Sequence, residues 1–338
     1  MCSLSKKWNI GISGLGVGMR HAKAIGQLEN FEVSFLCDID SSKRAEGQEL
    51  FPNAKVTGSF FELVNSSLVD AVVIACNDDQ HCSQILQCIA NNKFFIVEKP
   101  ICTNLADHKK IISALSSADK NYFLGSNLIL REVELYKWIK RNLKNGYFGD
   151  IYSIEGQYLY GRLEKLTKGW RGSIKDYSVT VGGGIHLIDT VCWLIDDFPE
   201  NVFAVGNKIV TDGHDYFGCD FVDANLAFKN GVIAKISSNF GCVHPHQHVF
   251  KIFGSKKTLI YDDKGPRVFL ERNDYAASTP LSLECVPNNK SALILKQLSS
   301  LNLTHEKFTF SNYFRSLEVC FSIDQSLNSG KSIKVRYF

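Results

Sequence analysis

The first 126 residues alternate between short apolar runs and stretches of helical character, and this alternation constrains the fold more than any other feature. The apolar runs are continuously hydrophobic, as expected for strands that are covered by helices on both faces. They lie at Trp8–Ser13, Glu32–Cys37, Val69–Cys76, Phe94–Val97 and Tyr122–Leu124. The helical stretches between them are Arg20–Leu28, Ser42–Leu50, Ser59–Asn65, Gln80–Ala90 and Leu105–Leu115. This repetition predicts parallel βαβ units and hence an α/β domain with a doubly wound parallel sheet.

The pattern changes after about Asn127, which indicates a second domain. Lys229-Asn230-Gly231 separates two apolar runs and predicts a β-hairpin. The predicted helices are Glu132–Leu143, which ends near Asn145-Gly146, and Ser311–Leu327, which stops at Gly330. The predicted strands are Ile151–Tyr160, Phe221–Phe228, Val232–Asn239, Val249–Phe253, Thr258–Tyr261 and Arg267–Leu270. We therefore predict an α+β domain with a large, mostly antiparallel open sheet, and two consecutive domains, 1–123 and 124–338.

Composition restricts the kinds of partner and the location. The net charge of +3 is too small for a general nucleic-acid-binding surface. No apolar run approaches the ~20 residues of a membrane span, and the N-terminal residues lack the apolar segment of a secretory signal. The 11 cysteines are odd in number and include no C-x-x-C. These features predict reduced thiols and a cytoplasmic protein that binds neither nucleic acid nor membrane.

A glycine cluster follows the first strand and predicts a dinucleotide site. Its sequence, Gly14-Leu15-Gly16-Val17-Gly18-Met19, is one residue shorter than the usual G-x-G-x-x-G, so a plain tight turn is the alternative. A strand before it, a helix after it, and Asp38 at the end of the second strand favour a pyrophosphate site. A carboxylate at Asp38 accepts hydrogen bonds from the adenosine ribose and repels a 2′-phosphate, which favours NAD over NADP.

Two further motifs are Glu98-Lys99-Pro100 and Gly182-Gly183-Gly184-Ile185-His186-Leu187-Ile188-Asp189. Together with the glycine turn, they give the chain a pattern that resembles the Gfo/Idh/MocA oxidoreductases. The resemblance covers nearly the whole chain. It includes Asp70–Asp79 with His81, Gly125–Asn127, Gly149–Tyr152, Phe253–Leu259 and the C-terminal helix.

The resemblance implies an N-terminal Rossmann domain, NAD(P) in a cleft, and hydride exchange at a sugar or polyol carbon. Lys99 matches the family lysine that reaches the substrate hydroxyl and the nicotinamide ribose. His186 matches the family histidine and is the expected proton acceptor, since an imidazole titrates near working pH. Asp189 is expected to orient that imidazole or bind a substrate hydroxyl, with an ordinary surface carboxylate as the alternative. The resemblance also implies a homodimer or homotetramer through the open sheet face.

Two positions depart from the family pattern. Gly182 stands where many members have an aspartate four residues before the histidine. Three alternatives are open: another residue supplies the acid, Lys99 and His186 work without it, or the chemistry differs from that of the family. Cys76-Asn77-Asp78-Asp79 stands where Thr-Pro-Asn is usual. We still expect Cys76, Asn77, His81 and Glu98 to line the cofactor, with a packed or capping histidine as the alternative for His81.

The substrate-side candidates are Asn127, Arg162, Trp170, Arg171 and His186. Arginines in such a loop suit carboxylate or phosphate recognition, although surface charge is an equally good interpretation. Tyr158 and Tyr160 share a strand face and suit either the cleft or packing. His244, His246 and His248 form a weak metal pattern, because no carboxylate or cysteine stands at ligand spacing, and we predict no metal.

The first functional prediction is an NAD-dependent oxidoreductase that acts on a sugar, polyol or nucleotide-activated sugar. Two alternatives stay open. One is a glycoside hydrolase that retains NAD and uses transient oxidation, and the other is a catalytically silent NAD-binding sensor. Retention of Lys99 argues against the silent sensor.

Overall fold

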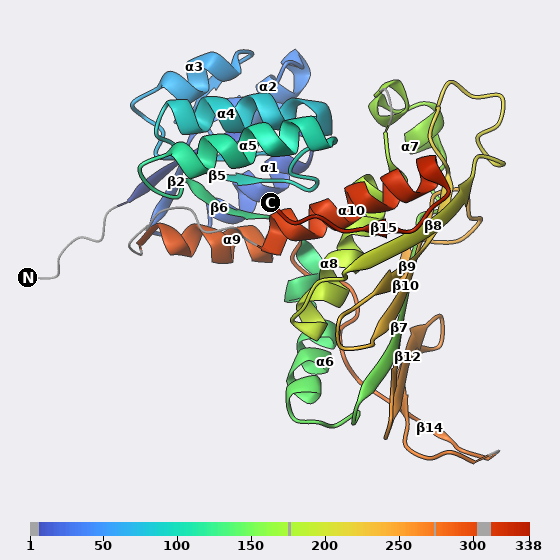
Figure 1. Cartoon of the computed structure of the whole chain (residues 1–338). Coiled ribbons are helices and arrows are strands. Elements are labelled where there is room, and N and C mark those ends of the chain that lie inside the picture. Colours follow the sequence, from blue (N-terminus) through green and yellow to red (C-terminus); the bar gives the residue numbers. More distant parts are fainter. Residues whose placement is uncertain (1–6, 175–176, 274, 303–311) are drawn as a thin grey trace, which may run out of the picture. The chain divides into compact units, whose positions relative to one another are not determined.

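The computed structural model describes residues 7–174, 177–273, 275–302 and 312–338. The chain forms two compact units (Figure 1). The first comprises residues 1–128 and 289–310, and the second comprises residues 129–288 and 311–338.

The first unit is built on a six-stranded sheet in which every neighbouring pair is parallel. Across the sheet the strands are β3 (Lys55–Thr57), β2 (Phe31–Cys37), β1 (Trp8–Ser13), β4 (Ala71–Ile74), β5 (Phe94–Val97) and β6 (Phe123–Ser126). This order confirms the predicted doubly wound sheet. The order reverses between β1 and β4, and ligands of such sheets bind at the carboxyl ends of the strands beside this point.

Helices cover both faces of this sheet, which explains the continuous apolar runs. They are α1 (Val17–Ile25), α2 (Ser41–Leu50), α3 (Phe60–Asn65), α4 (His81–Ala90) and α5 (Leu105–Ser117). Core side chains of the central strands, among them Ile12, Val73 and Ile96, are fully buried. The short edge strand β3 escaped the prediction because three residues carry too little pattern.

A segment from late in the sequence completes the first unit. It contains α9 (Ala292–Leu298) and a 3₁₀ turn at Ser299–Asn302. Nε2 of Gln297 donates a hydrogen bond to the carbonyl of Ser126 at 3.0 Å. A Cβ on Gly125 would lie 2.2 Å from that nitrogen, so glycine permits the approach. The compact units thus differ from the consecutive domains 1–123 and 124–338, because no local pattern shows that α9 packs against β6.

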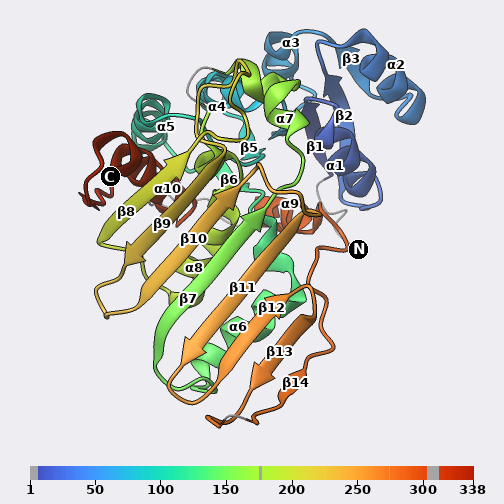
Figure 2. The ribbon, with the colours of Figure 1, turned by 90° about the vertical axis from the view of Figure 1, so that its right-hand side faces the viewer.

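The second unit contains a nine-stranded sheet (Figure 2). Across it the strands are β14 (Ser278–Pro280), β13 (Gly265–Phe269), β12 (Thr258–Asp262), β11 (Gln247–Gly254), β7 (Ile151–Leu159), β10 (Ile233–Asn239), β9 (Phe221–Ala227), β8 (Asn201–Asn207) and β15 (Ile333–Lys334). β7 and β10 pair in parallel, whereas the other neighbouring pairs are antiparallel. The mostly antiparallel sheet is therefore confirmed.

Figure 2 shows this sheet from its open face, with α6 (Glu134–Lys144), α8 (Ile185–Ile195) and α10 (Asn312–Ser329) behind it. Glycines stand where the turns were predicted. Gly231 in the β9–β10 hairpin has φ +84°, and Gly330 directly after α10 has φ +64°. These left-handed conformations favour glycine, which is why the turns could be predicted from sequence.

The ten cysteines in the described part of the chain are all free thiols. Across that same part, the helices are too short or too polar to cross a membrane.

Candidate active site

The glycine-rich turn lies at the carboxyl end of β1, and its three glycines have different surroundings. A Cβ on Gly14, which has φ +84°, would lie 2.4 Å from the carbonyl oxygen of Ala75. A Cβ on Gly18 would lie 2.9 Å from Cγ2 of Ile12, whereas a Cβ on Gly16 would have no neighbour within 4 Å. Gly14 thus allows the tight turn, and Gly18 allows the helix to pack closely on the strand. Gly16 leaves the backbone accessible to a ligand. Dinucleotide-binding turns divide these tasks in the same way.

Val17 and Met19 continue from this turn into α1. Val17 is the first residue of the helix and is exposed, whereas Met19 is buried. The helix therefore begins at the turn itself, three residues before the predicted start, and its N-terminus favours an anion there.

Asp38 ties the glycine-rich turn to the end of β2. Its Oδ2 accepts a hydrogen bond from the backbone N–H of Leu15 at 2.6 Å, and its Oδ1 accepts one from Asp40 at 2.9 Å. Each carboxylate oxygen can accept more than one hydrogen bond, so a ribose hydroxyl can still be bound. The guanidinium of Arg44 is held by the carbonyls of Asp38 and Ile39 at 2.8 Å each.

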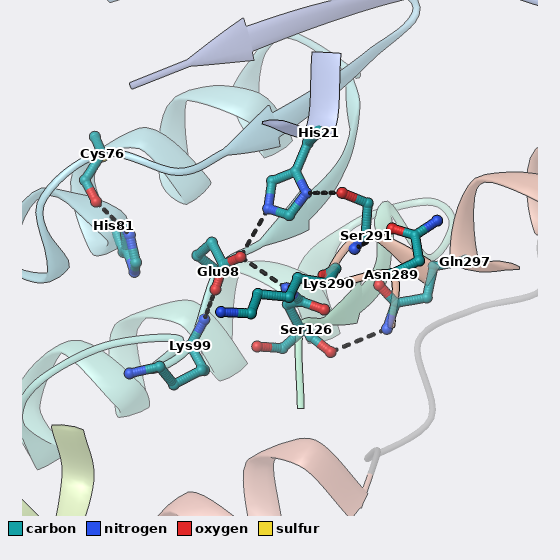
Figure 3. A network of polar contacts seen from close by, with 11 residues as sticks. His21, Cys76, His81, Glu98, Lys99, Ser126, Asn289, Lys290, Ser291 and Gln297 are labelled. Carbon is teal, nitrogen blue, oxygen red and sulfur yellow. Dashed lines mark hydrogen bonds and ion pairs between the residues drawn. The ribbon is translucent and has the colours of Figure 1, made fainter. Parts of the chain in front are cut away.

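Glu98, at the end of β5, is the centre of a buried polar network (Figure 3). Its Oε1 lies 2.8 Å from Nε2 of His21 and accepts a hydrogen bond from Nδ2 of Asn127 at 2.7 Å. Its Oε2 accepts a hydrogen bond from the backbone N–H of Lys99 at 3.2 Å. Nδ1 of His21 lies 2.8 Å from Oγ of Ser291. The network thus fixes the backbone that carries Lys99, whose peptide bond to Pro100 is cis.

Electrostatics keep Glu98 ionised. Burial acts to raise the pKa of Glu98, but hydrogen bonding and charge at His21, the Asn127 amide and the charge of Lys99 outweigh it, so the pKa is lowered. The sequence analysis missed His21 and Ser291. The position of His21, three residues after Gly18, could have marked it as a site residue. Nothing in the local sequence marks Ser291.

Both nitrogens of His81 contact the backbone, so the structure agrees with the packed alternative for this residue. Nδ1 lies 2.7 Å from the carbonyl oxygen of Pro100. Nε2 lies 3.3 Å from the carbonyl oxygen of Cys76, a contact that Figure 3 shows. His81 therefore connects the turns that follow β4 and β5. Burial raises the pKa of Cys76 to about 12, which keeps its thiol protonated. Asn77 precedes the 3₁₀ turn at Asp78–Gln80, where its carbonyl accepts a hydrogen bond from the N–H of Gln80 at 2.9 Å.

In the second unit, the glycine run Gly182–Gly184 precedes His186 and allows close packing. A Cβ on Gly182 would lie 1.9 Å from Oη of Tyr177. A Cβ on Gly183 would lie 2.5 Å from Cε1 of Tyr158, and one on Gly184 would lie 2.1 Å from Oγ of Ser238. The run forms a π-helical turn at Thr180–Gly184 that continues into α8. Each glycine therefore makes room for a different side chain.

His186 lies in a cluster of aromatic and imidazole rings. Its ring stacks on Tyr158, with centroids 6.2 Å apart, and meets His248 edge-on at 5.9 Å. Tyr158 also stacks on Tyr160 at 5.6 Å and contacts His246 at 5.1 Å. The cleft-facing and packing interpretations of the two tyrosines thus both remain, because the Tyr158 ring contacts His186 and the two tyrosine rings contact one another.

The three histidines of the weak metal pattern have different surroundings. Nε2 of His244 lies 3.3 Å from Oδ1 of Asp263, whereas His246 and His248 belong to the ring cluster. Burial lowers the pKa of His248 to about 3, with a smaller effect from His246, so the ring stays neutral. Within the described ranges, no group of three histidine, cysteine or carboxylate side chains is arranged to hold a metal ion.

Asp189 has a structural task that the sequence did not reveal. Its carboxylate is 1% exposed and accepts hydrogen bonds from Nε and Nη2 of Arg131, at 2.8 and 2.6 Å. Ser316 in α10 donates a third, at 2.9 Å. Asp189 is therefore not a surface carboxylate. None of these contacts directs it to the imidazole of His186, and we do not assign it to the reaction.

The substrate-side arginines lie against aromatic rings. The guanidinium of Arg162 is 5.3 Å from the ring centroid of Tyr160, and that of Arg171 is 4.3 Å from that of Trp170. The charges of both arginines act to lower the pKa of Tyr158, but burial outweighs them and the pKa is raised. In the first unit, the Asn127 amide also donates to the carbonyl of Lys290 at 3.3 Å.

Comparison with known proteins agrees with this geometry. Residues 8–126 match the oxidoreductase family with an NAD-binding Rossmann fold, and residues 136–260 match the GFO/IDH/MocA C-terminal domain. A myo-inositol 2-dehydrogenase of Thermotoga maritima is 26% identical over 262 residues, which are 75% of each chain.

Solved structures show the same fold. Scyllo-inositol dehydrogenase from Lactobacillus casei with bound NAD(H) and scyllo-inositol aligns with a TM-score of 0.77 and 17% identity, over 97% of this chain and 99% of that one. Levoglucosan dehydrogenase in complex with NADH and levoglucosan aligns with a TM-score of 0.83 and 16% identity, over 98% of this chain and all of that one.

The open glycine turn on a parallel sheet and the N-terminal family match define an NAD-binding oxidoreductase. With both of its domains matched, the chain belongs to the Gfo/Idh/MocA family.

Proposed function

We propose that this protein is an NAD-dependent dehydrogenase or reductase that acts on a hydroxyl or keto carbon of a sugar, polyol or nucleotide-activated sugar. The observation that carries the proposal is the network around Glu98. It fixes the backbone of Lys99 at the sheet edge that also holds the open glycine turn. The names of the inositol and levoglucosan dehydrogenases support the substrate class.

The fit of the first unit to NAD rests on its own residues. Gly16 and Val17 would hold the pyrophosphate through backbone N–H groups, and Asp38 would bind the adenosine ribose. Gly14, whose N–H donates to the carbonyl of Cys37 at 2.8 Å, forms the turn that brings them to the cofactor. Cys76 and Asn77, in the turn after β4, are proposed to line the nicotinamide side. His81 supports that turn through its backbone contacts.

We propose Lys99 and His186 as the residues that handle the hydroxyl proton. The chemistry that NAD supplies is acceptance of a hydride from the alcohol carbon. The imidazole of His186 accepts the hydroxyl proton, and the ammonium of Lys99 donates a hydrogen bond to the oxygen as it becomes a carbonyl. In the reductive direction the same proton returns from His186 to the oxygen.

Asn127, Arg162, Trp170 and Arg171 are proposed to bind the rest of the substrate. The arginines stack on aromatic rings, which restricts their side chains and prepares them for bidentate contacts with oxygen atoms. A sugar face can also pack against an aromatic side chain such as Trp170.

A homodimer or homotetramer through the open face of the nine-stranded sheet is part of the proposal. Phe203, Val205 and Ile233 are 41, 55 and 53% exposed there. They alternate with side chains that face the helices, such as Val202 and Ala204. Exposed apolar side chains on a sheet face are typical of an association surface. Light scattering coupled to size exclusion tests the association, and Phe203→Glu is expected to weaken it.

The free thiols support a cytoplasmic location.

The test is formation of NADH, followed by absorbance, across inositols, levoglucosan, free hexoses, uronic acids and nucleotide sugars. We expect turnover with at least one of these classes and a preference for NAD over NADP. Release of an aglycone from a nitrophenyl glycoside without net NADH would instead establish the glycoside hydrolase alternative. Tight NADH binding without turnover of any of these compounds would point to the silent sensor.

A further inference from the structure

A row of charged side chains crosses the middle of the nine-stranded sheet. Lys235 in β10 stands opposite Glu155 in β7, and Glu155 stands opposite Lys251 in β11. Nζ of Lys251 donates a hydrogen bond to Oε2 of Glu155 at 2.9 Å, and Nζ of Lys235 lies 3.1 Å from Oδ2 of Asp223 in β9. From β9 through β10 and β7 to β11, the charges therefore alternate from negative to positive on adjacent strands.

This charged row lies on the open face of the sheet, which Figure 2 shows. Side chains alternate between the two faces along a strand, and the neighbours Ala234, Ile236 and Ile154 are buried. The side chains of Lys235 and Glu155 are 51 and 35% exposed. The row is thus available to a partner on the side of the sheet that faces away from the helices.

Apolar side chains stand at both ends of the same row. Phe203 in β8 pairs with Asn225, which in turn pairs with Lys235. At the other end, Ile260 in β12 pairs with Lys251 and is half-buried. An interface between proteins commonly combines apolar contact area with polar groups that are paired, so the whole row suits association better than contact with water alone.

The order of the charges distinguishes between two ways of placing a second copy on this face. Copies of one chain associate most often about a two-fold axis, which brings the same surface of both copies together. An axis that runs parallel to the strands, between β7 and β10, lays β7 of one copy over β10 of the other. Lys235 then meets the partner's Glu155, and Phe203 lies over the partner's Ile260. An axis across the strands, along the row, would set each charge against its own copy.

The position of this axis also favours a large contact. β7 is the middle strand of the sheet, so an axis beside it lets nearly all of one sheet cover the other. Two sheets that pack face to face keep their strands roughly aligned, as this axis requires.

We propose that two copies of the chain associate through the open face about a two-fold axis parallel to the strands, between β7 and β10, and that Lys235 and Glu155 select this arrangement. The inference rests on the homo-oligomer in the proposed function and specifies its geometry. Charge pairs across an interface fix its orientation and exclude wrong arrangements, whereas the apolar side chains supply contact area.

The first test reverses one charge at a time. In Glu155→Lys and in Lys235→Glu, like charges meet at both sides of the axis, and we expect the dissociation constant of the dimer to rise at least about tenfold. Sedimentation velocity over a dilution series measures it. Lys229→Glu is the matched control, because it makes the same charge change in the exposed turn of the β9–β10 hairpin. The control should associate like wild type. Thermal melts verify folding, which partly exposed ion pairs influence little.

The second test combines the two reversals. An equal mixture of Glu155→Lys and Lys235→Glu brings together one copy that is positive at both positions and one that is negative at both. We expect a heterodimer with a dissociation constant within a few-fold of the wild-type value. The chain that carries both substitutions should likewise recover its own association, because opposite charges again meet across the axis.

Wild-type association of both single variants would overturn the inference. So would a heterodimer of wild type with Glu155→Lys that is tighter than the wild-type dimer, because an axis across the strands predicts it. Should a reversal variant fail to fold, Glu155→Gln and Lys235→Gln decide instead: a weaker dimer supports the inference, and an unchanged one contradicts it. A chain that stays monomeric would overturn the inference, whereas NADH formation in the substrate panel would still decide the dehydrogenase activity.

Discussion

Nε2 of His21 lies 2.8 Å from Oε1 of Glu98, and this contact joins the helix that follows the glycine-rich turn to the residue before Lys99. His21 is fully buried, and its other nitrogen lies 2.8 Å from Oγ of Ser291. One side chain thus connects three segments that are distant in sequence (Figure 3).

Replacement of His21 by leucine should destabilise the first unit. The change removes a hydrogen bond to a buried carboxylate, and we expect a loss of about 2–3 kcal/mol in the free energy of unfolding, measured by denaturant titration. His21→Gln retains an N–H donor and should recover part of this loss. Equal stability of the two variants would show that the contact with Glu98 contributes little.

Lys99→Ala should lower turnover by orders of magnitude and leave NADH binding within a few-fold, because the ammonium contacts the reacting oxygen in our proposal. Steady-state kinetics and fluorescence titration with NADH measure the two effects separately. Lys110→Ala serves as the control, since Lys110 is an exposed residue of α5 paired with Asp107. Activity in Lys99→Ala equal to that of the control would remove Lys99 from the mechanism.

Alanine at Gly16 and at Gly14 should have different consequences. The Cβ at position 16 meets nothing within 4 Å, so Gly16→Ala should keep the wild-type melting temperature but bind NADH at least about tenfold more weakly. The Cβ at position 14 would collide with the Ala75 carbonyl in a left-handed backbone conformation, so Gly14→Ala should lose stability as well. Thermal melts and NADH titrations distinguish the two. Undiminished NADH binding in Gly16→Ala would contradict the proposed cofactor position.

The ion pair between Arg131 and Asp189 predicts a stability effect rather than a catalytic one. Burial acts to lower the pKa of Arg131, but the charge and hydrogen bonds of Asp189 outweigh it and the pKa is raised. Asp189→Asn leaves a buried guanidinium without its counter-charge and should cost about 3–5 kcal/mol in the free energy of unfolding. The kcat of the remaining folded enzyme should stay within a few-fold. A large fall in kcat at unchanged stability would restore Asp189 to the reaction.

Asp324 in α10 should make stability depend on pH. Burial raises its pKa to about 7, against an ordinary value near 4, although Ser178 donates a hydrogen bond to Oδ1 at 2.8 Å. Between about pH 4 and 7 the folded chain holds a proton at Asp324 that the unfolded chain has released. This contribution to stability is therefore complete below pH 4 and is lost as pH rises to 7.

Asp324→Asn should flatten this dependence and gain about 1–3 kcal/mol relative to wild type at pH 8. Denaturant unfolding at pH 5 and pH 8 measures the difference between the two proteins. The same difference at both pH values would show that Asp324 does not change its protonation on unfolding.

Local sequence was enough for the parallel sheet, the β9–β10 hairpin and the glycine turn. Strand and helix periodicity follow from which faces are buried, and Gly14, Gly231 and Gly330 are required by backbone conformation alone. Motif spacing likewise placed Lys99 at the end of β5 and His186 at the start of α8.

Partners far apart in the chain were decided only by the tertiary structure. α9 packs against β6, and Ser291 reaches His21 across 270 positions of sequence. The motif that contains His186 made Asp189 a candidate catalytic residue. In the structure, its carboxylate accepts hydrogen bonds from Arg131 and Ser316 instead. No sequence motif marks Tyr177, and only the tertiary structure shows that its hydroxyl packs against Gly182. Periodicity and glycine spacing report the backbone and burial of each segment, whereas the pairing of buried polar side chains depends on which segments meet after folding.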